Sequence, residues 1–311
     1  MRIAIFGRTM HAESLGELSA FVQELKGVDP LEAVVYKPFK NYVLNLLADN
    51  VKGVEIQARE QLIEFFEGAG EFLSHKDLSE KTNFFFSLGG DGTFLSALPF
   101  LRDSNIPIVG LNFGRLGFLT SSKIADNGST NKWLENLLGG KYTTAPRPLL
   151  ELECEEAPQD FYPFALNEFA LQREGPAVLE MNIKINGQQV PGYVADGVLV
   201  STPTGSTAYS LSAGGPIVLP ECNVLNLVPI APHNLNVRPL VLPSSSVVEI
   251  SFSTRYNCAR VTADNRSFNV SPGKTIKIKQ SSTALTVVTP DIDFMSALNK
   301  KLYWGADRRN L

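Results

Sequence analysis

Cysteines and long apolar runs are scarce in this 311-residue chain. Its three cysteines, Cys154, Cys222 and Cys258, lie far apart and form no Cys-x-x-Cys pair. This spacing argues against a zinc site or a disulfide framework and fits free thiols in a reducing cytosol. No apolar run approaches the roughly 20 residues that cross a bilayer, and the apolar start at residues 3–6 is too short for a signal peptide. We therefore expect a soluble, cytoplasmic protein with no membrane partner.

An excess of positive charge is also missing, since the formal net charge is −4. Nucleic-acid binders usually carry a basic excess, so we expect no nucleic-acid partner. The chain has no GxxxxGK[ST] phosphate loop, no HRD and DFG set, no GxGxxG fingerprint and no GxSxG. Its three histidines are isolated. These absences exclude the common nucleotide triphosphatases and protein kinases and leave little support for a hydrolase.

The length suits two domains, and the first half alternates strand-like with helical patterns. Such alternation is typical of a Rossmann-like parallel sheet covered by helices, which is the α/β fold class. In these sheets, ligands bind beyond the carboxyl ends of the strands. We expect strands at residues 3–6, 33–36, 83–88 and 106–111, and helices at 11–26, around 42–47, at 57–72 and at 93–102.

The pattern changes near residues 143–148, after which helical periodicity largely disappears. Apolar and polar residues alternate at 150–155 and 181–185, and Asn186-Gly187 is a strong hairpin signal. We therefore predict an all-β, β-sandwich-like domain over residues 147–289. Its further strands are expected at 197–201, 247–253, 266–270, 275–279 and 284–288. Residues 294–303 are helical in pattern again and are expected to return to the first domain, which then comprises 1–146 plus 290–311.

Three glycines, Gly89, Gly90 and Gly92, surround Asp91 directly after an apolar run. The pattern predicts a buried strand, a tight turn and a helix start, where backbone N–H groups can approach a bulky anion. Asp91 is placed either to accept a proton from a hydroxyl beside a phosphate or simply to cap the helix. The flanking glycines favour phosphate handling, because a plain cap does not need them.

Small hydroxyl residues and glycines dominate residues 201–216, just after Asp196. The segment is either a flexible loop or the lining of a site for a ligand that carries ribose and phosphate. The apolar residues 198–200 and Tyr209 anchor it and favour the lining.

Asn167-Glu168 interrupts an apolar run from residue 164 to residue 171. A buried charge without a partner is costly. Glu168 therefore either faces water on an edge strand or belongs to a polar pair that hydrogen-bonds the hydroxyls of a ligand.

Together these segments resemble the NAD kinase family. The similarity is carried by residues 89–93, 112–119, 167–168, 196–216, 227–233 and 238–240, in the family's order. Diacylglycerol kinases, sphingosine kinases and phosphofructokinases share the Gly-Gly-Asp-Gly element, whereas the long signature at 196–216 is highly specific. A lipid kinase and a non-catalytic NAD(P)-binding sensor remain the alternatives.

The resemblance implies transfer of the γ-phosphate of ATP to the 2′-hydroxyl of the adenosine ribose of NAD, which gives NADP. It also implies an N-terminal α/β domain, a C-terminal β domain with the active site between them, and Mg²⁺ or another divalent cation. The metal ligands are not identified. NAD and ATP are the implied substrates, and a homodimer or homotetramer is the implied assembly.

By position, Asp91 resembles the family's general base, with Gly92 and Thr93 shaping its turn. Asn167 and Glu168 resemble the pair that holds ribose hydroxyls, and Asp196 a contact to the same dinucleotide. Thr207, Ala208, Tyr209 and Ser212 resemble the wall around the bases. The other implied nucleotide-binding residues are Gly89, Gly90, Phe118, Thr204, Gly205, Ser206 and Asn265. Many relatives carry a basic residue where this chain has Val194, so a phosphate contact is missing or supplied elsewhere.

Overall fold

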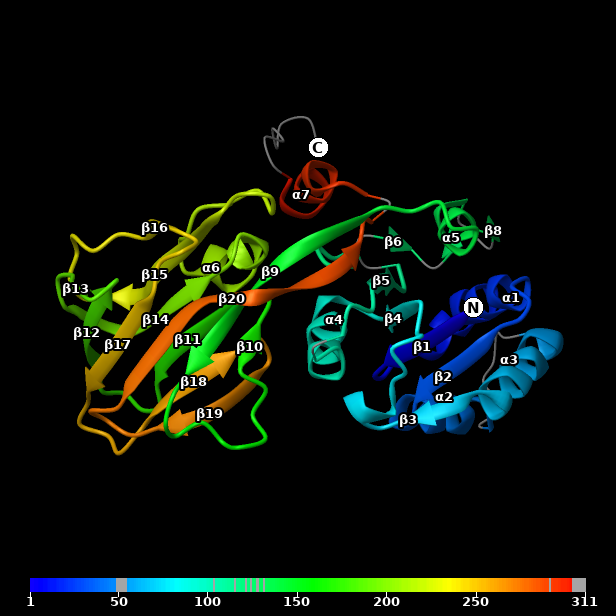
Figure 1. Ribbon diagram of the computed structural model, residues 1–311, viewed down its shortest axis with the longest axis horizontal. Coiled ribbons are helices and arrows are strands. Elements are labelled where there is room, and N and C mark those ends of the chain that lie inside the picture. The colour runs from blue at the N-terminus through cyan, green and yellow to red at the C-terminus, as the bar shows by residue number, and fades with distance from the viewer. Residues whose placement is uncertain are drawn as a thin grey trace. The chain divides into compact units, whose positions relative to one another are not determined.

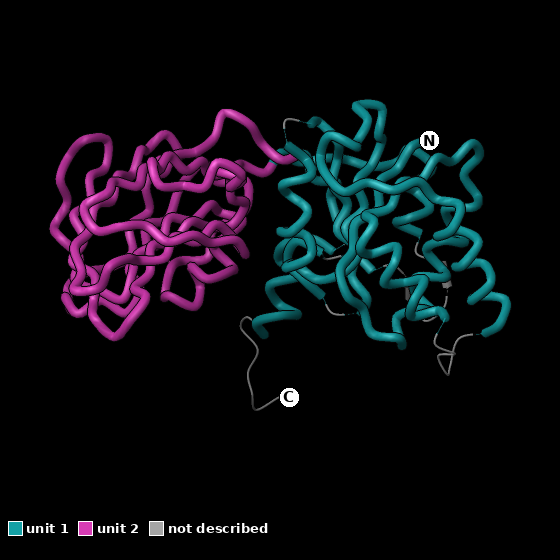
Figure 2. Tube along the Cα trace, turned by 90° about the horizontal axis from the view of Figure 1, so that it is seen from below, with its two compact units in different colours: residues 1–146, 286–311 teal, residues 147–285 magenta. Residues whose placement is uncertain are grey.

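The computed structural model describes residues 1–48, 55–102, 104–114, 116–120, 122–123, 125–126, 129–130, 132–290 and 292–303. The chain divides into two compact units, coloured separately in Figure 2. Unit 1 comprises Met1–Pro146 and Thr286–Leu311, and unit 2 comprises Arg147–Leu285. The chain passes from one unit to the other within two long strands, β9 (Thr144–Glu153) and β20 (Thr275–Val288).

Unit 1 is built on a parallel sheet in the order β3-β2-β1-β4-β5, and β6 and the end of β20 pair with β5 (Figure 1). The strands are β1 (Arg2–Gly7), β2 (Glu32–Tyr36), β3 (Gly70–Phe72), β4 (Phe84–Leu88), β5 (Ile108–Asn112) and β6 (Ser122–Lys123). A short antiparallel pair, β7 (Ala125–Asp126) and β8 (Ser129–Thr130), lies apart from this sheet. The predicted α/β architecture is confirmed.

Helices and single turns of 3₁₀ helix connect these strands. The α-helices of unit 1 are α1 (Leu15–Lys26), α2 (Lys37–Ala48), α3 (Ile56–Gly68), α4 (Asp91–Ala97), α5 (Lys132–Leu138) and α7 (Phe294–Leu302). The 3₁₀ turns are η1 (Ala12–Ser14), η2 (His75–Asp77) and η3 (Leu98–Phe100). The last helix, α7, falls in unit 1 as predicted.

Successive side chains of a strand point to opposite faces of the sheet, and residues of unit 1 pack against both faces. Ile3 and Ile5 of β1 pack in one apolar core with residues of α1, α2, α3 and α5. Phe6 of β1 points to the opposite face from Ile3 and Ile5. The centre of its ring lies 4.9 Å from that of Tyr36 and 5.2 Å from that of Phe100. The buried sheet leaves polar groups at its carboxyl edge, where the candidate site lies.

Four helix predictions had wrong boundaries. The α-helix predicted over 11–26 begins at Leu15, after the 3₁₀ turn η1. The helix predicted over 57–72 ends at Gly68, because residues 70–72 pair with β2 as a parallel strand. The helix predicted over 93–102 begins at Asp91 and ends at Ala97. Pro99 follows in η3 and has no N–H with which to continue the α-helical ladder. The helix predicted around 42–47 begins earlier, at Lys37.

Unit 2 consists of antiparallel strands that diverge from β14 (Tyr193–Ser201). One edge of β14 pairs with β15, and the other pairs first with β12 and then with β11. One layer continues through β11, β18 and β19, and the other through β12, β17, β20, β9 and β10. The remaining strands are β10 (Phe164–Ala165), β11 (Glu168–Arg173), β12 (Leu179–Ile185), β13 (Gln188–Gln189), β15 (Val224–Pro232), β16 (Leu240–Pro243), β17 (Val248–Ser253), β18 (Ala259–Ala263) and β19 (Arg266–Val270).

An apolar core lies between these strands, as the predicted β-sandwich-like fold requires. On β12, Leu179, Met181 and Ile183 are buried while the residues between them are exposed. Asn186-Gly187 forms the predicted hairpin turn, with φ of 52° and 79°. The strands predicted at 275–279 and 284–288 are one continuous strand, β20. The strand predicted over 150–155 is the end of the longer β9, which stops at Glu153.

Candidate active site

The Asp91 carboxylate lies at the first turn of α4, directly beyond β4. The N-cap position is occupied by Gly90 and Asp91 is the first residue of the helix, so the capping alternative is wrong. Instead, Asp91 Oδ1 accepts hydrogen bonds from the N–H groups of Leu119 and Thr120, at 3.1 Å each, and from the Thr120 hydroxyl at 3.0 Å. Among the described residues, Oδ2 accepts one hydrogen bond, from the Phe118 N–H at 2.9 Å. Because a carboxylate oxygen has two lone pairs, Oδ2 has room for a further donor.

Asn112, at the end of β5, holds the loop that supplies these donors. Its side-chain amide is buried and donates to the carbonyl oxygens of Thr120 at 2.6 Å and Ser122 at 3.0 Å. Its Oδ1 accepts from the Gly114 N–H at 3.0 Å. The strands β4 and β5 are parallel neighbours, so their carboxyl ends bring Asp91 and this loop together. Arg115, within the same predicted segment, lies outside the described residues.

Gly117 permits the close approach between the loop and the carboxylate. A Cβ atom built on Gly117 would lie 1.9 Å from Asp91 Oδ1. Gly117→Ala is therefore expected to displace the carboxylate and to lower turnover by about 10²-fold, since misplacing a reacting group by about 1 Å has an effect of that size. Steady-state kinetics checks this. Gly16→Ala, on α1 with nothing within 4 Å of the added atom, is the control. Equal kinetics for the two variants would contradict the expectation.

The glycine turn leaves bare backbone beside Asp91. Gly89 has a φ of 145°, and an added Cβ would lie 2.6 Å from the hydroxyl oxygen of the half-buried Thr93. Gly90 and Gly92 are exposed, with nothing within 4 Å of an added Cβ. In the predicted phosphate-binding turn, the backbone conformation therefore requires a glycine at position 89, whereas Gly90 and Gly92 leave the backbone exposed.

In unit 2, three segments that carry predicted site residues meet at the start of β11. The Thr202 N–H donates to the Asn167 carbonyl oxygen at 2.9 Å, and the Thr202 hydroxyl donates to that of Leu166 at 2.6 Å. The Asp264 carboxylate accepts from the N–H groups of residues 166, 167 and 168, at 2.9, 2.8 and 3.3 Å. Asn265, exposed in the turn between β18 and β19, follows Asp264 directly. Asn167-Glu168, the turn from Thr202 to Gly205 and Asp264 thus form one cluster of polar groups, which we call the polar junction.

Glu168 is buried in this junction, with 7% of its surface exposed. Its strand pairs on both sides, with β14 and β18, so the edge-strand alternative is wrong. Burial and the nearby charge of Asp264 raise the pKa of Glu168 to about 8. Its Oε2 has no hydrogen-bond partner in the described part of the chain, whereas Asp264 has three N–H donors and lies 3.8 Å from Arg266. We therefore place the negative charge on Asp264 and a proton on Glu168.

This protonation makes the free energy of unfolding depend on pH. Between the ordinary pKa of 4.5 and the folded value of about 8, the folded state binds one proton more at Glu168 than the unfolded state. The contribution of Glu168 to the free energy of unfolding is therefore fully present below about pH 4.5 and falls as the pH rises from there to about 8. Glu168→Gln removes the dependence, so its free energy of unfolding should fall less between about pH 5 and pH 8 than that of the wild type. Urea denaturation at several pH values measures both slopes, and identical slopes would contradict the assignment.

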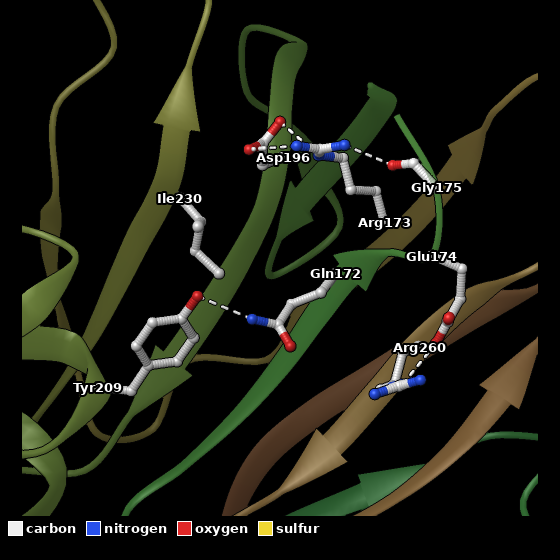
Figure 3. A pocket seen from close by; sticks show the side chains of 8 residues that line it. All are labelled: Gln172, Arg173, Glu174, Gly175, Asp196, Tyr209, Ile230 and Arg260. Carbon is white, nitrogen blue, oxygen red and sulfur yellow. Dashed lines mark hydrogen bonds and ion pairs between the residues drawn. The ribbon is translucent and has the colours of Figure 1, made fainter. Parts of the chain in front are cut away.

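A polar cavity of about 520 Å³ lies near the other end of β11 (Figure 3). Arg173 Nε lies 2.7 Å from Asp196 Oδ1 and its Nη2 lies 3.2 Å from Oδ2, a two-point ion pair. Gln172 donates to the Tyr209 hydroxyl at 2.7 Å. The cavity is lined by Gln172, Arg173, Glu174, Gly175, Asp196, Tyr209, Ile230 and Arg260. Two predicted residues, Asp196 and Tyr209, thus share a cavity with two arginines that were not predicted.

The Ser/Thr/Gly segment is ordered, so the flexible-loop alternative is wrong. Residues 201–206 are buried, and 204–207 and 209–212 form the short helices η4 (Thr204–Thr207) and α6 (Tyr209–Ser212). Ser206 donates to the Val218 carbonyl oxygen at 3.1 Å, while the buried Thr204 hydroxyl has no partner among the described residues. Thr207 and Ala208 are half-buried and Ser212 is exposed.

Besides Arg260, three residues at these places were not predicted. Asp264 follows a strand in a hairpin turn, where an aspartate usually faces water. Arg173 ends a strand and has the pattern of a surface cation. Lys301 lies 3.6 Å from Asp91 Oδ2 but belongs to α7, far away in the sequence. Neither spacing nor composition signals any of the three.

No three His, Cys, Asp or Glu residues among those that the structure describes gather closely enough to hold a metal ion. In the same part of the chain, no helix has the length and apolar character to cross a membrane.

Two family models match this chain, one in unit 1 and the other mostly in unit 2. The family model described as the ATP-NAD kinase N-terminal domain matches residues 41–142, and that of the ATP-NAD kinase C-terminal domain matches residues 166–289. The NAD kinase of Christiangramia forsetii is 35% identical over the full length of both chains. That of Flavobacterium psychrophilum is 40% identical over 77% of this chain and 82% of its own.

Two solved structures share the fold. A yeast NADH kinase complexed with NADH superposes with a TM-score of 0.79 at 23% identity, over 100% of this chain and 90% of its own. An NAD kinase from Archaeoglobus fulgidus in complex with ATP gives 0.67 at 24% identity, over 94% of each chain. The matched domains span most of the sequence and include the Asp91 turn and the polar junction of unit 2. This chain belongs to the ATP-NAD kinase family.

Proposed function

We propose that this chain transfers the γ-phosphate of ATP to the 2′-hydroxyl of the adenosine ribose of NAD and thereby forms NADP. The supporting observation is the Asp91 carboxylate, which lies at the carboxyl edge of a parallel sheet and keeps Oδ2 open, in a chain that both family models match. Phosphoryl transfer needs mainly positioning and charge stabilisation, and this edge provides a fixed carboxylate beside exposed glycines.

Asp91 is the general base in this proposal. The ribose 2′-oxygen forms a bond to the γ-phosphorus, the bond from that phosphorus to the bridging oxygen of ADP breaks, and the hydroxyl proton passes to Asp91 Oδ2. The three donors on Oδ1 keep the carboxylate in one orientation. A positioned base contributes about 10²–10⁴-fold to the rate. The exposed Gly90 and Gly92 offer backbone surface to the triphosphate.

Unit 2 binds the dinucleotide in this proposal. Asn167 and a protonated Glu168 face ribose hydroxyls, and a neutral carboxyl can both donate to and accept from such groups. Asp196 and Tyr209 line the polar cavity. Arg173 holds Asp196 through two contacts and supplies positive charge there, in a chain that carries Val194 where many relatives have a basic residue.

We also propose that a divalent cation, Mg²⁺ or a similar ion, enters with the triphosphate. The described residues form no cluster of three ligating side chains, so in this proposal the ion is held mainly by phosphates and water. Bound there, the ion offsets charge on the phosphate oxygens. We propose a homodimer or homotetramer on the family resemblance alone. The free, widely spaced cysteines support a cytoplasmic location.

The decisive test is incubation of the purified chain with Mg-ATP and NAD, with NADP measured by an NADP-specific dehydrogenase. We expect catalytic formation of NADP. Parallel reactions with radiolabelled ATP and either diacylglycerol or sphingosine test the lipid-kinase alternative. Formation of labelled lipid without NADP would contradict the proposal and favour the lipid kinase. Binding of NAD without any turnover would favour the non-catalytic sensor.

A further inference from the structure

The last helix, α7, reaches the Asp91 carboxylate through one face. Phe294 and Lys301 are seven residues apart, which places them on the same side of an α-helix. The Phe294 ring lies 5.9 Å from that of Phe118, and the Lys301 ammonium lies 4.5 Å from the centre of the Phe118 ring. Phe118 also donates its N–H to Asp91. All of these residues belong to unit 1.

Lys301 lies beside the one carboxylate oxygen that has room for a substrate. Its Nζ is 3.6 Å from Asp91 Oδ2, and both side chains are 29% exposed. This is ion-pair range but longer than a normal hydrogen bond. Among the described residues Lys301 donates no hydrogen bond, so its contacts there are the ion pair and the Phe118 ring. An ammonium carries three N–H donors, and they are therefore available to a ligand that enters this half-open site.

The proposed chemistry brings an anion to this position. A hydroxyl that gives its proton to Oδ2 must lie about 2.6–3.2 Å from that oxygen. The phosphoryl group that bonds to this hydroxyl then lies in the immediate surroundings of Lys301 Nζ. Negative charge is spread over the oxygens of the transferring group, and a lysine binds such oxygens as a point charge.

We propose that Lys301 is a phosphate-binding residue that contacts the transferring phosphoryl group of ATP, with α7 and Phe118 holding it beside Asp91. This proposal rests on the proposed kinase function. It assigns to the last helix a role in the reaction rather than in packing alone. The ammonium has no part in the proton transfer, which remains with Asp91.

The test compares Lys301→Met, which keeps an apolar side chain on the Phe118 ring, with Lys301→Arg, which keeps the positive charge. Lys300→Met, an exposed neighbour on the same helix, is the matched control. Loss of one charged hydrogen bond is expected to lower kcat/KM for Mg-ATP by about ten- to hundredfold in Lys301→Met. The KM for NAD should stay within a few-fold, and Lys301→Arg should retain more activity than Lys301→Met.

Equilibrium binding of ATP without NAD gives a second readout that needs no turnover. We expect weaker ATP binding by Lys301→Met than by Lys300→Met, at equal melting temperatures. Values of ATP affinity and of kcat/KM for Mg-ATP within twofold of the control would overturn the proposal, as would a loss confined to NAD. If the wild type and Lys300→Met form no NADP, the proposed function fails, and the ATP-binding comparison still decides the role of Lys301.

Discussion

Asp91→Asn should lower the kcat for NADP formation by about 10²–10⁴-fold, the contribution of a positioned general base. An amide oxygen cannot take up the hydroxyl proton at neutral pH, whereas the carboxylate has an open position at Oδ2. The affinity for NAD should change by no more than a few-fold, because Asp91 is proposed to contact only the 2′-hydroxyl and the other proposed dinucleotide contacts belong to unit 2. Steady-state kinetics and equilibrium NAD binding together measure the two effects.

The control for this variant must disturb the hydrogen bonds of Asp91 without removing the base. Thr120→Val does so, since it deletes the 3.0 Å hydrogen bond from the Thr120 hydroxyl and keeps the three backbone donors. One such bond contributes about 0.5–1.5 kcal/mol, so a loss of less than about tenfold is expected. Near-normal turnover in Asp91→Asn, or equal losses in both variants, would rule out the base.

Gly205→Ala should disrupt the polar junction of unit 2. A Cβ atom on Gly205 would lie 2.1 Å from the Asn167 carbonyl oxygen and 2.5 Å from its carbonyl carbon, and neither can move without shifting the backbone. The shift displaces Asn167 and Glu168 from the turn that begins at Thr202. Overpacking of this kind costs about 1–3 kcal/mol of stability.

The same displacement should raise the KM for NAD by about tenfold or more, because the proposed ribose contacts move with the backbone. Chemical denaturation and kinetics with varied NAD check the two parts. Gly68→Ala, at the end of α3 with nothing within 4 Å of the added atom, is the control. Wild-type stability together with a wild-type KM would show that Gly205 is not needed for the junction.

The parts of the fold that depend on local pattern were predictable. Asp91 and its glycines follow a strand of buried residues, and the turn type is encoded within six residues of sequence. Asn186-Gly187 likewise encodes its own turn. The polar role of Asn167-Glu168 was also predictable, because two polar residues within an apolar run indicate hydrogen-bonding groups in a buried strand.

Features that depend on partners far away in the sequence were not predictable. Residues 70–72 form a strand because β2 offers an unpaired edge, although their sequence continues a helical pattern. Asp264 is recognisable as part of the junction only when three backbone N–H groups are seen to converge on it. Lys301 resembles any lysine near the end of a helix until the fold sets it beside Asp91.

The central claim is that the Asp91 carboxylate receives the proton of the ribose 2′-hydroxyl. A crystal structure of the protein with NAD and a non-hydrolysable ATP analogue measures the relevant distance directly. The account predicts an Asp91 Oδ atom about 2.6–3.2 Å from the 2′-oxygen of the adenosine ribose. A carboxylate that faces away from the ribose, well beyond hydrogen-bond distance, would contradict it.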